Sequence, residues 1–230
     1  MISLKDKINK SDSVCAVIPF YNEKSTLLEV IKETTKFVDF IFAVNDGSND
    51  DNYETEKNEK DVQFIEHNKN YGKGKALSTG FDASISAGYS YVITIDADLQ
   101  HNPEYIPVLL DAMKSYDIVV GNRLKDLKLM PLHRRLSNKI TTFLLTVKTG
   151  QNILDSQCGF RGYSVEVLKN VRTSYNGFEA ESEILVKAAR KGFNIGFVDI
   201  PTIYGNEKSK MRSFQAILGF IKVLFQRNES

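Results

Sequence analysis

The chain of 230 residues has little excess charge, few cysteines and no long apolar run. Its net charge of +1 argues against general nucleic-acid binding, because that function normally requires a marked excess of Lys and Arg. No apolar run approaches the roughly 20 residues that a membrane-spanning helix needs, and residues 1–13 lack the apolar core of a signal peptide. We therefore expect a cytoplasmic protein that does not cross a membrane by itself.

The two cysteines, Cys15 and Cys158, show no metal-ligand spacing, and their small number favours buried, reduced thiols. The composition is otherwise that of an ordinary soluble globular protein, with 42% hydrophobic and 26% charged residues. A chain of this length can form one large domain or two small ones. Since no repeat or low-complexity linker interrupts it, we expect a single domain.

Strand-like and helix-like segments alternate in the first half of the chain. Short β-branched runs predict strands at residues 14–19, 40–44, 62–65, 91–95 and 117–121. Three helices are predicted between these strands. The first has a possible capping box at Thr26–Glu29, the second covers residues 73–87, and the third begins near Pro103. Repeated βα units of this length predict an α/β fold with a doubly wound, mostly parallel sheet. In such sheets, ligands bind beyond the carboxyl ends of the strands.

The pattern changes after Gly121. We expect helices over 134–147 and 179–190, a compact polar turn at 155–161 that leads into a strand, a strand over 195–200 and a basic loop over 204–212. The chain is thus expected to comprise a Rossmann-like nucleotide-binding half (14–121), an acceptor half (122–212) and a C-terminal amphipathic helix (213–226).

Asp96, Asp98 and Gln100 directly follow the apolar run Tyr91–Ile95 and carry the most chemical information in the chain. Side chains two apart on an extended backbone share a face, so these three can converge at the end of the strand. Two carboxylates there attract a hard cation such as Mg²⁺, which proteins usually hold with one or two carboxylates and substrate phosphates. The alternative is a polar turn that caps the helix beginning near Pro103.

Gly72-Lys73-Gly74-Lys75-Ala76-Leu77 does not fit a dinucleotide-binding fingerprint, because Leu77 occupies the third glycine position. No P-loop sequence occurs either, which argues against a P-loop nucleotidase. A helix N-terminus favours anions, so Lys73 and Lys75 are candidates for contact with phosphate. A solvated helix terminus is the alternative.

Four motifs, taken in order, resemble those of family-2 glycosyltransferases of the GT-A fold. They are Val17–Glu23, Val44–Ser48, Asn70–Gly74 and Asp96–Glu104. Each motif is weak alone, but four in sequence are specific, and the resemblance extends from Val14 to about Arg212. With Asp155–Arg161, the last motif looks most like polyprenol-phosphate (dolichol-phosphate) mannosyl- and glucosyltransferases. The resemblance implies a GDP- or UDP-sugar donor, a Mg²⁺ or Mn²⁺ ion and a lipid phosphate acceptor.

On the donor side, the resemblance implies a nucleotide-sugar pocket and a metal site. The base and ribose pocket is lined by Pro19, Tyr21, Glu23 and Asp46, while Asp96 faces the nucleotide or the metal. The resemblance implies that Asp98 and Gln100 hold the metal with Asp96. Asp98 is expected to be catalytic because it holds the cation that offsets charge on the departing nucleoside diphosphate. The alternatives are a helix-entry loop for Tyr21 and Glu23, and a plain turn for Asp46.

On the acceptor side, a basic stretch begins at Arg123. Guanidinium groups suit phosphate because they offer paired donors in fixed geometry. The candidates for the acceptor phosphate are Arg123, Arg134, Arg135, Asn138, Lys208 and Lys210. Asn138 shares a helical face with Arg134, although Ser137 is a second candidate for its place. The loop with Lys208 and Lys210 is expected to close over phosphates; a solvated basic face is the alternative for the helix.

Glu181 and Glu183 lie in a stretch that resembles the family's acidic segment near the reacting centre, and we predict catalytic roles for both. A hydroxyl acceptor would need a general base to remove its proton. A phosphate monoester, whose second pKa is about 6, is already mostly a dianion at pH 7. With that acceptor, a carboxylate orients groups or balances charge. The alternative is that both glutamates are exposed helix residues.

The end of the chain carries an apolar stripe at helical spacing, formed by Phe214, Ile217, Leu218, Ile221, Leu224 and Phe225. This stripe can dock onto the protein's own core. It can also lie on a bilayer beside a prenyl chain, helped by Lys222 and Arg227.

The sequence thus predicts an inverting, metal-dependent glycosyltransferase that moves a hexose, mannose or glucose, from a GDP- or UDP-sugar to a polyprenyl phosphate. Such an enzyme would work at the cytoplasmic face of a membrane, alone or with an anchoring partner protein. One alternative is the same fold acting on a saccharide or another hydroxyl. A non-catalytic nucleotide-sugar-binding module and, more distantly, a nucleotidyltransferase are the others.

Overall fold

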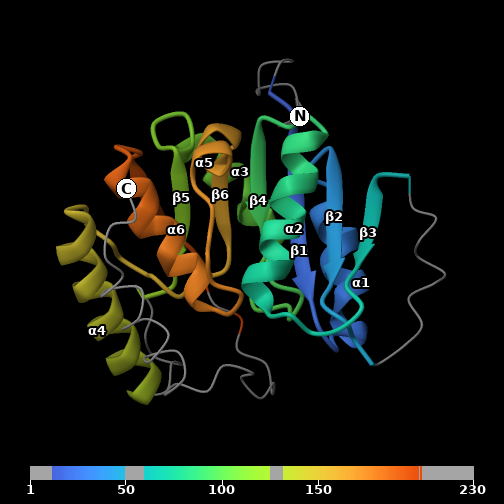
Figure 1. Cartoon of the computed structure of the whole chain (residues 1–230), viewed down its shortest axis with the longest axis horizontal. Coiled ribbons are helices and arrows are strands. Elements are labelled where there is room, and N and C mark those ends of the chain that lie inside the picture. The colour runs from blue at the N-terminus through green and yellow to red at the C-terminus, as the bar shows by residue number, and fades with distance from the viewer. Residues whose placement is uncertain (1–11, 50–59, 125–131, 202, 204–230) are drawn as a thin grey trace.

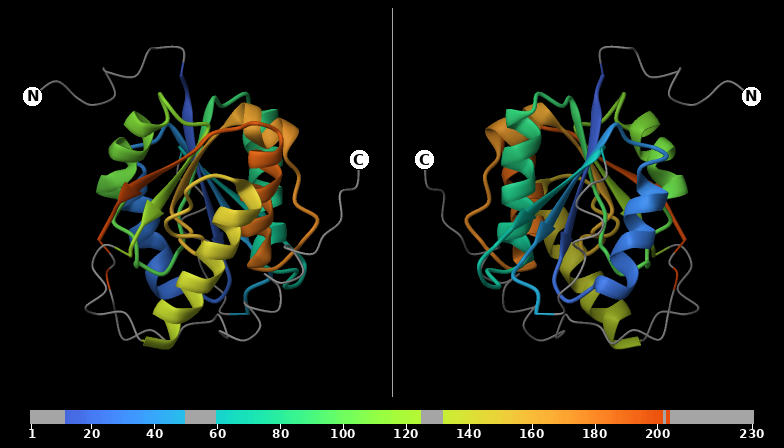
Figure 2. Two further views of the ribbon diagram at one scale, coloured as in Figure 1. Left: turned by 90° about the vertical axis from the view of Figure 1, so that its left-hand side faces the viewer. Right: turned by 90° about the vertical axis from the view of Figure 1, so that its right-hand side faces the viewer.

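The computed structural model describes residues 12–49, 60–124, 132–201 and 203, with the backbone alone for 132–137. In this part of the chain, one seven-stranded sheet has the order β3-β2-β1-β4-β6-β5-β7 (Figure 1). Helices cover both faces of the sheet, so the fold has three layers (Figure 2). The predicted α/β architecture with a doubly wound, mostly parallel sheet is confirmed.

The first four strands form the parallel part of the sheet. They are β1 (Val14–Phe20), β2 (Phe40–Asn45), β3 (Val62–Glu66) and β4 (Tyr91–Thr94). β1 lies between β2 and β4, and all of its residues are buried, including the predicted pocket residue Pro19. The backbone N–H and C=O groups of odd-numbered residues in β1 point toward β4. The pairing of β1 with β4 ends at Val17, before Pro19 is reached. No strand therefore requires the N–H that Pro19 lacks.

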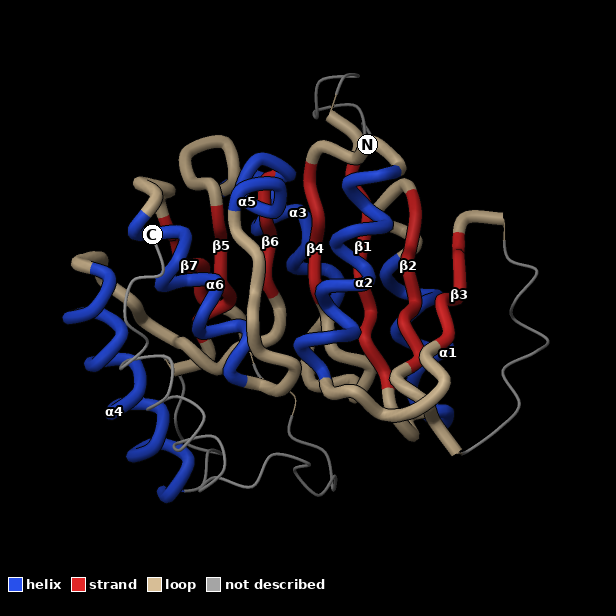
Figure 3. The backbone as a smooth tube through the Cα atoms, viewed as in Figure 1, coloured by secondary structure: helices blue, strands red, loops and turns tan. Residues whose placement is uncertain are grey.

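β6 (Arg161–Ser164) runs antiparallel to its neighbours β4 and β5 (Ile118–Asn122), whereas β7 (Ile195–Asp199) is parallel to β5 at the sheet edge. Because of this reversal, the segment that precedes β6 lies at the edge where the other strands end (Figure 3). The predicted polar turn is thereby placed beside the residues that follow β4 and β5.

The helices form two layers. α2 (Lys73–Ser86), α5 (Val165–Asn170) and α6 (Glu179–Arg190) cover one face of the sheet, and α1 (Lys24–Thr34) and α3 (Ile106–Ala112) cover the other (Figures 1 and 2). α4 (Leu132–Thr149) packs against α6 at one end of the molecule. Within the described residues, none of the helices has the length and apolarity that crossing a bilayer requires.

One helix start differs from the prediction, and a second agrees with it. α1 begins at Lys24, and the Thr26 hydroxyl donates to the carbonyl of Glu23 at 3.2 Å, so the predicted capping box at Thr26–Glu29 is wrong. The helix predicted from Pro103 begins as a 3₁₀ turn, η3 (Pro103–Tyr105), before α3. Proline suits this first position, because its missing N–H would have no partner inside the helix.

A single buried hydrophobic cluster extends from Val14 to Ile200 among the described residues. It contains Cys15 and Cys158, which are free and buried, as predicted. Burial raises the pKa of both thiols to about 12, so both stay protonated and unreactive at neutral pH.

Candidate active site

The loops that follow β1 and β2 are joined at the carboxyl edge of the sheet. The N–H of Asn22 donates to Ser48 Oγ at 2.9 Å, and Asn22 Oδ1 accepts from the N–H of Asn49 at 2.8 Å. Asn22 has a φ of 52°, a left-handed conformation that Asn adopts more readily than most residues. Tyr21 and Glu23, both predicted to line the nucleotide pocket, flank it and are half-buried.

Asp46 is buried just after β2 and organises the loop before α2. Its Oδ1 accepts from the N–H of Tyr71 at 3.0 Å, and its Oδ2 accepts from the N–H of Gly72 at 2.7 Å. His67 Nδ1 lies 2.8 Å from Oδ1. Asp46 therefore helps to position the start of α2, and with it Lys73. The sequence indicated a pocket residue but not this contact.

Lys73, Asp96 and Glu181 form the centre of the candidate site. Lys73 Nζ lies 2.7 Å from Asp96 Oδ1 and 3.1 Å from Glu181 Oε2, so a residue of α2 links the end of β4 to α6. Burial lowers the pKa of Lys73, but the two carboxylates outweigh this effect and raise it. Burial raises the pKa of Asp96, but Lys73 outweighs this effect and lowers it. Lys73 and Asp96 are therefore both charged at neutral pH.

Gly159, in the turn before β6, provides the space that Asp96 occupies. A Cβ on Gly159 would lie 2.3 Å from Asp96 Oδ2 and 2.8 Å from Lys73 Nζ. The carboxylate thus lies directly against the backbone of the turn. Only glycine permits this approach, because any side chain would occupy the same place.

The chain does not continue as an extended strand beyond Asp96. β4 ends at Thr94, and the backbone turns at Asp98 and Leu99, whose φ of 60° is left-handed. Asp98 Oδ1 accepts from the N–H of Gln100 at 3.1 Å. The predicted alternation of Asp96, Asp98 and Gln100 along a strand is therefore wrong, because a polar turn positions the last two. A left-handed leucine is strained, and such strain is concentrated at functional sites.

A second charged cluster joins Arg123, Asp155 and Asn138. Arg123 follows β5, and its Nε and Nη2 donate to Asp155 Oδ2 and Oδ1 at 2.8 and 3.1 Å. Asn138 of α4 donates to Oδ1 at 3.0 Å. Burial raises the pKa of Asp155, but Arg123 and the hydrogen bonds lower it to about 2. Two acceptor candidates thus share a carboxylate that the sequence marked only as part of a polar turn.

Arg161 is fully buried and holds the turn before β6 in place. Its Nε donates to the carbonyl of Cys158 at 2.7 Å, and its Nη2 donates to the carbonyl of Ser156 at 3.0 Å. Its Nη1 donates to the carbonyl of Glu181 at 2.9 Å. One guanidinium therefore joins the turn to the first residues of α6.

Two buried polar atoms at this edge, His101 Nδ1 and Glu181 Oε1, have no hydrogen-bond partner within the described parts of the chain. Burial lowers the pKa of His101 to about 4, so its ring is neutral at pH 7, and it stacks on Phe160 with centroids 5.5 Å apart. Buried polar atoms are normally paired. Glu181 Oε1 lies 3.7 Å from Nε of the buried Arg161, so His101 Nδ1 is the candidate for contact with a polar ligand. His101 was not predicted as a site residue, although it lies within the Asp96–Glu104 motif.

Glu183 does not join the central cluster. Its Oε2 accepts from the N–H of Ser174 at 2.7 Å and from the hydroxyl of Thr173, and its Oε1 lies 2.8 Å from Lys187 Nζ. These contacts fasten the segment before α6 to the helix. The structure therefore brings Glu181 to Asp96 but places Glu183 elsewhere.

The predicted metal ligands suit a hard cation that is shared with phosphate. Asp96, Asp98 and Gln100 offer the oxygen donors that Mg²⁺ and Mn²⁺ prefer. Three His, Cys, Asp or Glu side chains do not converge on one point within the ranges that the structure describes. Two carboxylates with substrate phosphates are nevertheless the usual set for Mg²⁺. The predicted acceptor residues whose side chains lie outside the described part are Arg134, Arg135, Lys208 and Lys210.

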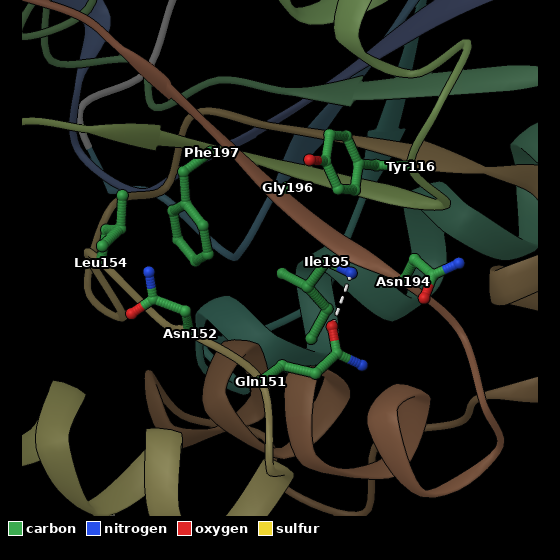
Figure 4. Close-up of a pocket in the computed structure, with 8 residues that line it drawn as sticks. All are labelled: Tyr116, Gln151, Asn152, Leu154, Asn194, Ile195, Gly196 and Phe197. Atoms are coloured by element: carbon green, nitrogen blue, oxygen red, sulfur yellow. Dashed lines mark hydrogen bonds between the residues drawn. The ribbon is translucent and has the colours of Figure 1, made fainter.

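A separate cavity of about 480 Å³ lies at the outer edge of β7 and contains none of the predicted site residues (Figure 4). Gly196 is covered by Tyr116, whose ring would lie 2.4 Å from a Cβ there. Gln151 accepts from the N–H of Ile195 and donates to the carbonyl of Phe193, both at 2.8 Å. The Gln151 side chain thereby pairs with the first N–H of β7 at the open edge of the sheet.

The fold matches that of GT-A glycosyltransferases of known structure. Mannosyl-3-phosphoglycerate synthase from Rubrobacter xylanophilus superposes with a TM-score of 0.78 at 17% identity, covering 96% of this chain and 75% of that chain. Glucosyl-3-phosphoglycerate synthase from Mycobacterium tuberculosis superposes with a TM-score of 0.70 at 19% identity, covering 95% and 82%. At these identities the likeness concerns the fold.

The sequence profile of glycosyl transferase family 2 matches residues 15–172, and the chain belongs to this family. An uncharacterized protein of Methanocaldococcus jannaschii is 35% identical over 96% of this chain and 93% of its own length. UDP-N-acetylglucosamine–dolichyl-phosphate N-acetylglucosaminyltransferase of Methanococcus voltae is 32% identical, covering 89% and 90%. Undecaprenyl-phosphate 4-deoxy-4-formamido-L-arabinose transferase of Pectobacterium atrosepticum is 33% identical over 68% of this chain and 50% of that protein.

Proposed function

We propose that this glycosyltransferase moves a sugar from a nucleoside-diphosphate donor to a polyprenyl phosphate. The observation that carries the proposal is the pair of charged clusters at one edge of the sheet. Lys73 joins Asp96 to Glu181 on the donor side, and Asp155 anchors Arg123 on the acceptor side. An anchored guanidinium suits an acceptor that is itself an anion. The names of the Methanococcus voltae and Pectobacterium relatives, which include dolichyl and undecaprenyl phosphate, support this acceptor class.

A divalent cation, Mg²⁺ or Mn²⁺, is the proposed cofactor. Asp96, Asp98 and Gln100 would hold it together with the diphosphate of the donor, GDP- or UDP-linked. When bound, the ion supplies positive charge against the departing nucleoside diphosphate. Asp96 is also 2.7 Å from Lys73, so Lys73 orients this carboxylate. The glucosyl-3-phosphoglycerate synthase, which was solved with Mn²⁺ and UDP-glucose, supports a cation in this fold.

The proposed reaction requires no general base. A phosphate monoester has its second pKa at about 6, so the acceptor oxygen is mostly deprotonated at pH 7. That oxygen attacks the anomeric carbon opposite the diphosphate, the carbon–oxygen bond to the diphosphate breaks, and the configuration inverts. Arg123 orients the acceptor phosphate. Glu181 balances the charges of Lys73 and Arg161, which lie 3.1 Å from its Oε2 and 3.7 Å from its Oε1.

The candidate sugars are mannose, glucose and N-acetylglucosamine. The sequence predicts mannose or glucose, whereas the name of the Methanococcus voltae relative specifies N-acetylglucosamine. A lipid acceptor also places the enzyme at a membrane surface. We therefore propose peripheral association with the cytoplasmic face, alone or with an anchoring partner protein.

A radiolabelled transfer assay tests the proposal. GDP-mannose, UDP-glucose and UDP-N-acetylglucosamine are each combined with polyprenyl phosphate or with simple saccharides, in Mn²⁺ or in EDTA. We expect label to enter the organic phase only with polyprenyl phosphate and Mn²⁺. Label on a saccharide would establish a hydroxyl acceptor instead. Mn²⁺-dependent nucleotide binding without any transfer would identify a non-catalytic binding module.

A further inference from the structure

Over residues 138–149, where the structure describes side chains, the inward face of α4 is largely polar, which is the reverse of the usual pattern for a helix at a protein surface. Asn138 donates to Asp155 at 3.0 Å, and Thr141 Oγ1 is hydrogen-bonded to Ser156 Oγ at 3.1 Å. Leu145 is the fully buried apolar residue on this face. Because hydrogen bonds occupy much of the inward face, three large apolar residues of this part of α4 are left exposed on the other side.

The outward face of α4 carries Ile140, Phe143 and Val147, which are spaced three and four residues apart and so lie side by side. Their exposed fractions are 48%, 66% and 68%. Phe143 and Val147 are the most exposed large hydrophobic residues in the described part of the chain. Single exposed apolar residues are ordinary, but a contiguous row indicates a binding surface.

We propose that residues 213–226 of this chain dock on this outward face of α4. The described chain ends near the carboxyl edge of the sheet, where the N–H of Ile203 donates to the carbonyl of Gln100 at 3.2 Å. Asn138 ties α4 to the same edge through Asp155. Residues 204–212 number nine and reach about 30 Å when extended, which is ample for a neighbouring helix.

The two surfaces also match in chemistry and length. As a helix, the 14 residues 213–226 would be about 21 Å long, and their apolar stripe repeats at three and four residues, as does the row on α4. Ridges of this spacing pack into each other's grooves. A short linker holds the segment at an effective concentration in the millimolar range. Tethering therefore favours the segment over a second copy of the chain at micromolar protein concentrations.

Cysteine protection in the full chain tests the docking. Cys15 and Cys158 are fully buried and do not react in the folded protein. An introduced cysteine is therefore the one thiol that the reagent modifies. Val147→Cys probes the row on α4, and Lys114→Cys, at a side chain 65% exposed, is the accessible control. We expect maleimide to modify Val147→Cys roughly tenfold more slowly than Lys114→Cys, because the segment must first detach.

Substitutions in residues 213–226 then test whether this segment causes the slow modification of Val147→Cys. Leu218→Asp with Ile221→Asp, on the apolar stripe, should restore the rate to that of the control. Gln215→Asp with Gln226→Asp, which adds the same charge to the other side, should leave the reaction slow. Equal rates for both cysteines in the full chain would overturn the proposal. So would protection that grows with protein concentration, which indicates a second copy, or protection that requires phosphatidylglycerol vesicles. Because the assay does not measure transfer, its failure leaves the proposed function untouched.

Discussion

At the residue scale, the site depends on how closely one carboxylate approaches a glycine. Asp96 lies against Gly159, and its position is then held by Lys73. Both contacts come from segments far from Asp96 in the sequence. A displacement of about 1 Å at a reacting group can cost on the order of 100-fold in rate, even when the protein remains folded.

We expect Gly159→Ala to lower kcat/KM by about 100-fold, because its Cβ and Asp96 Oδ2 cannot occupy the same space. Gly88→Ala is the control. A Cβ at Gly88 meets nothing within 4 Å, but its φ of +80° is left-handed, so this variant should lose about 1 kcal/mol of stability and keep its activity. Steady-state kinetics and urea denaturation measure both. An unchanged kcat/KM for Gly159→Ala would refute the close approach.

The two glutamates of α6 form a matched pair. Glu181→Gln removes the negative charge beside Lys73, so we expect kcat/KM to fall by about 10- to 100-fold. Glu183→Gln weakens the contacts with Thr173, Ser174 and Lys187, so we expect a loss of about 2 kcal/mol in the free energy of unfolding and nearly normal kinetics. The same kinetic loss in both variants would contradict these separate roles.

At the scale of elements, the reversed strand β6 assembles the acceptor side. The turn before β6 carries Asp155, which receives hydrogen bonds from Arg123 after β5 and from Asn138 on α4. Arg161, the first residue of β6, holds the same turn in place through hydrogen bonds to the carbonyls of Cys158 and Ser156. Three elements thus meet at one carboxylate, so the stability of this region should depend on its charge.

Asp155→Asn should lower the free energy of unfolding at pH 7 by about 3 kcal/mol, because Arg123 loses its charged partner. The pKa of Asp155 is about 2, below the ordinary 3.8, so its ionised form stabilises the fold fully above about pH 4 and less as the pH falls toward 2. The difference between wild type and variant should therefore shrink by about 2 kcal/mol over that interval.

Urea denaturation between pH 7 and pH 2 measures this dependence. Asp111→Asn is the control, because its ion pair with Lys114 is exposed and should contribute almost nothing. A difference between wild type and Asp155→Asn that stays constant with pH would show that the carboxylate is not the stabilising group.

At the scale of the whole molecule, the candidate site lies between the two halves of the chain. Lys73 and Asp96 come from the first half, and Gly159 and Glu181 come from the second. A donor bound at these residues contacts both halves at once. Its binding should therefore stabilise the complete fold as well as one loop.

UDP or GDP with Mn²⁺, at 100 times the dissociation constant, should add about 2.7 kcal/mol to the free energy of unfolding. For a chain of this size, the expected rise in Tm is roughly 5–10 °C. Calorimetry measures it, and EDTA or Asp98→Asn should abolish most of it. A full rise in EDTA would show that nucleotide binding does not depend on the cation.

The sequence by itself determined most of the strands and helices, the polar edge and the family, because each of these depends on local spacing or short motifs. It did not predict the short helix α5. The direction of β6, the assembly of Asp155 with Arg123 and the turn at Leu99 required the tertiary structure, since they depend on pairing between distant segments. Glu181 and Glu183 show the difference most clearly. They are two residues apart on one helix, about 200° apart around its axis, and only the packing of α6 against α2 decides which of them meets Lys73.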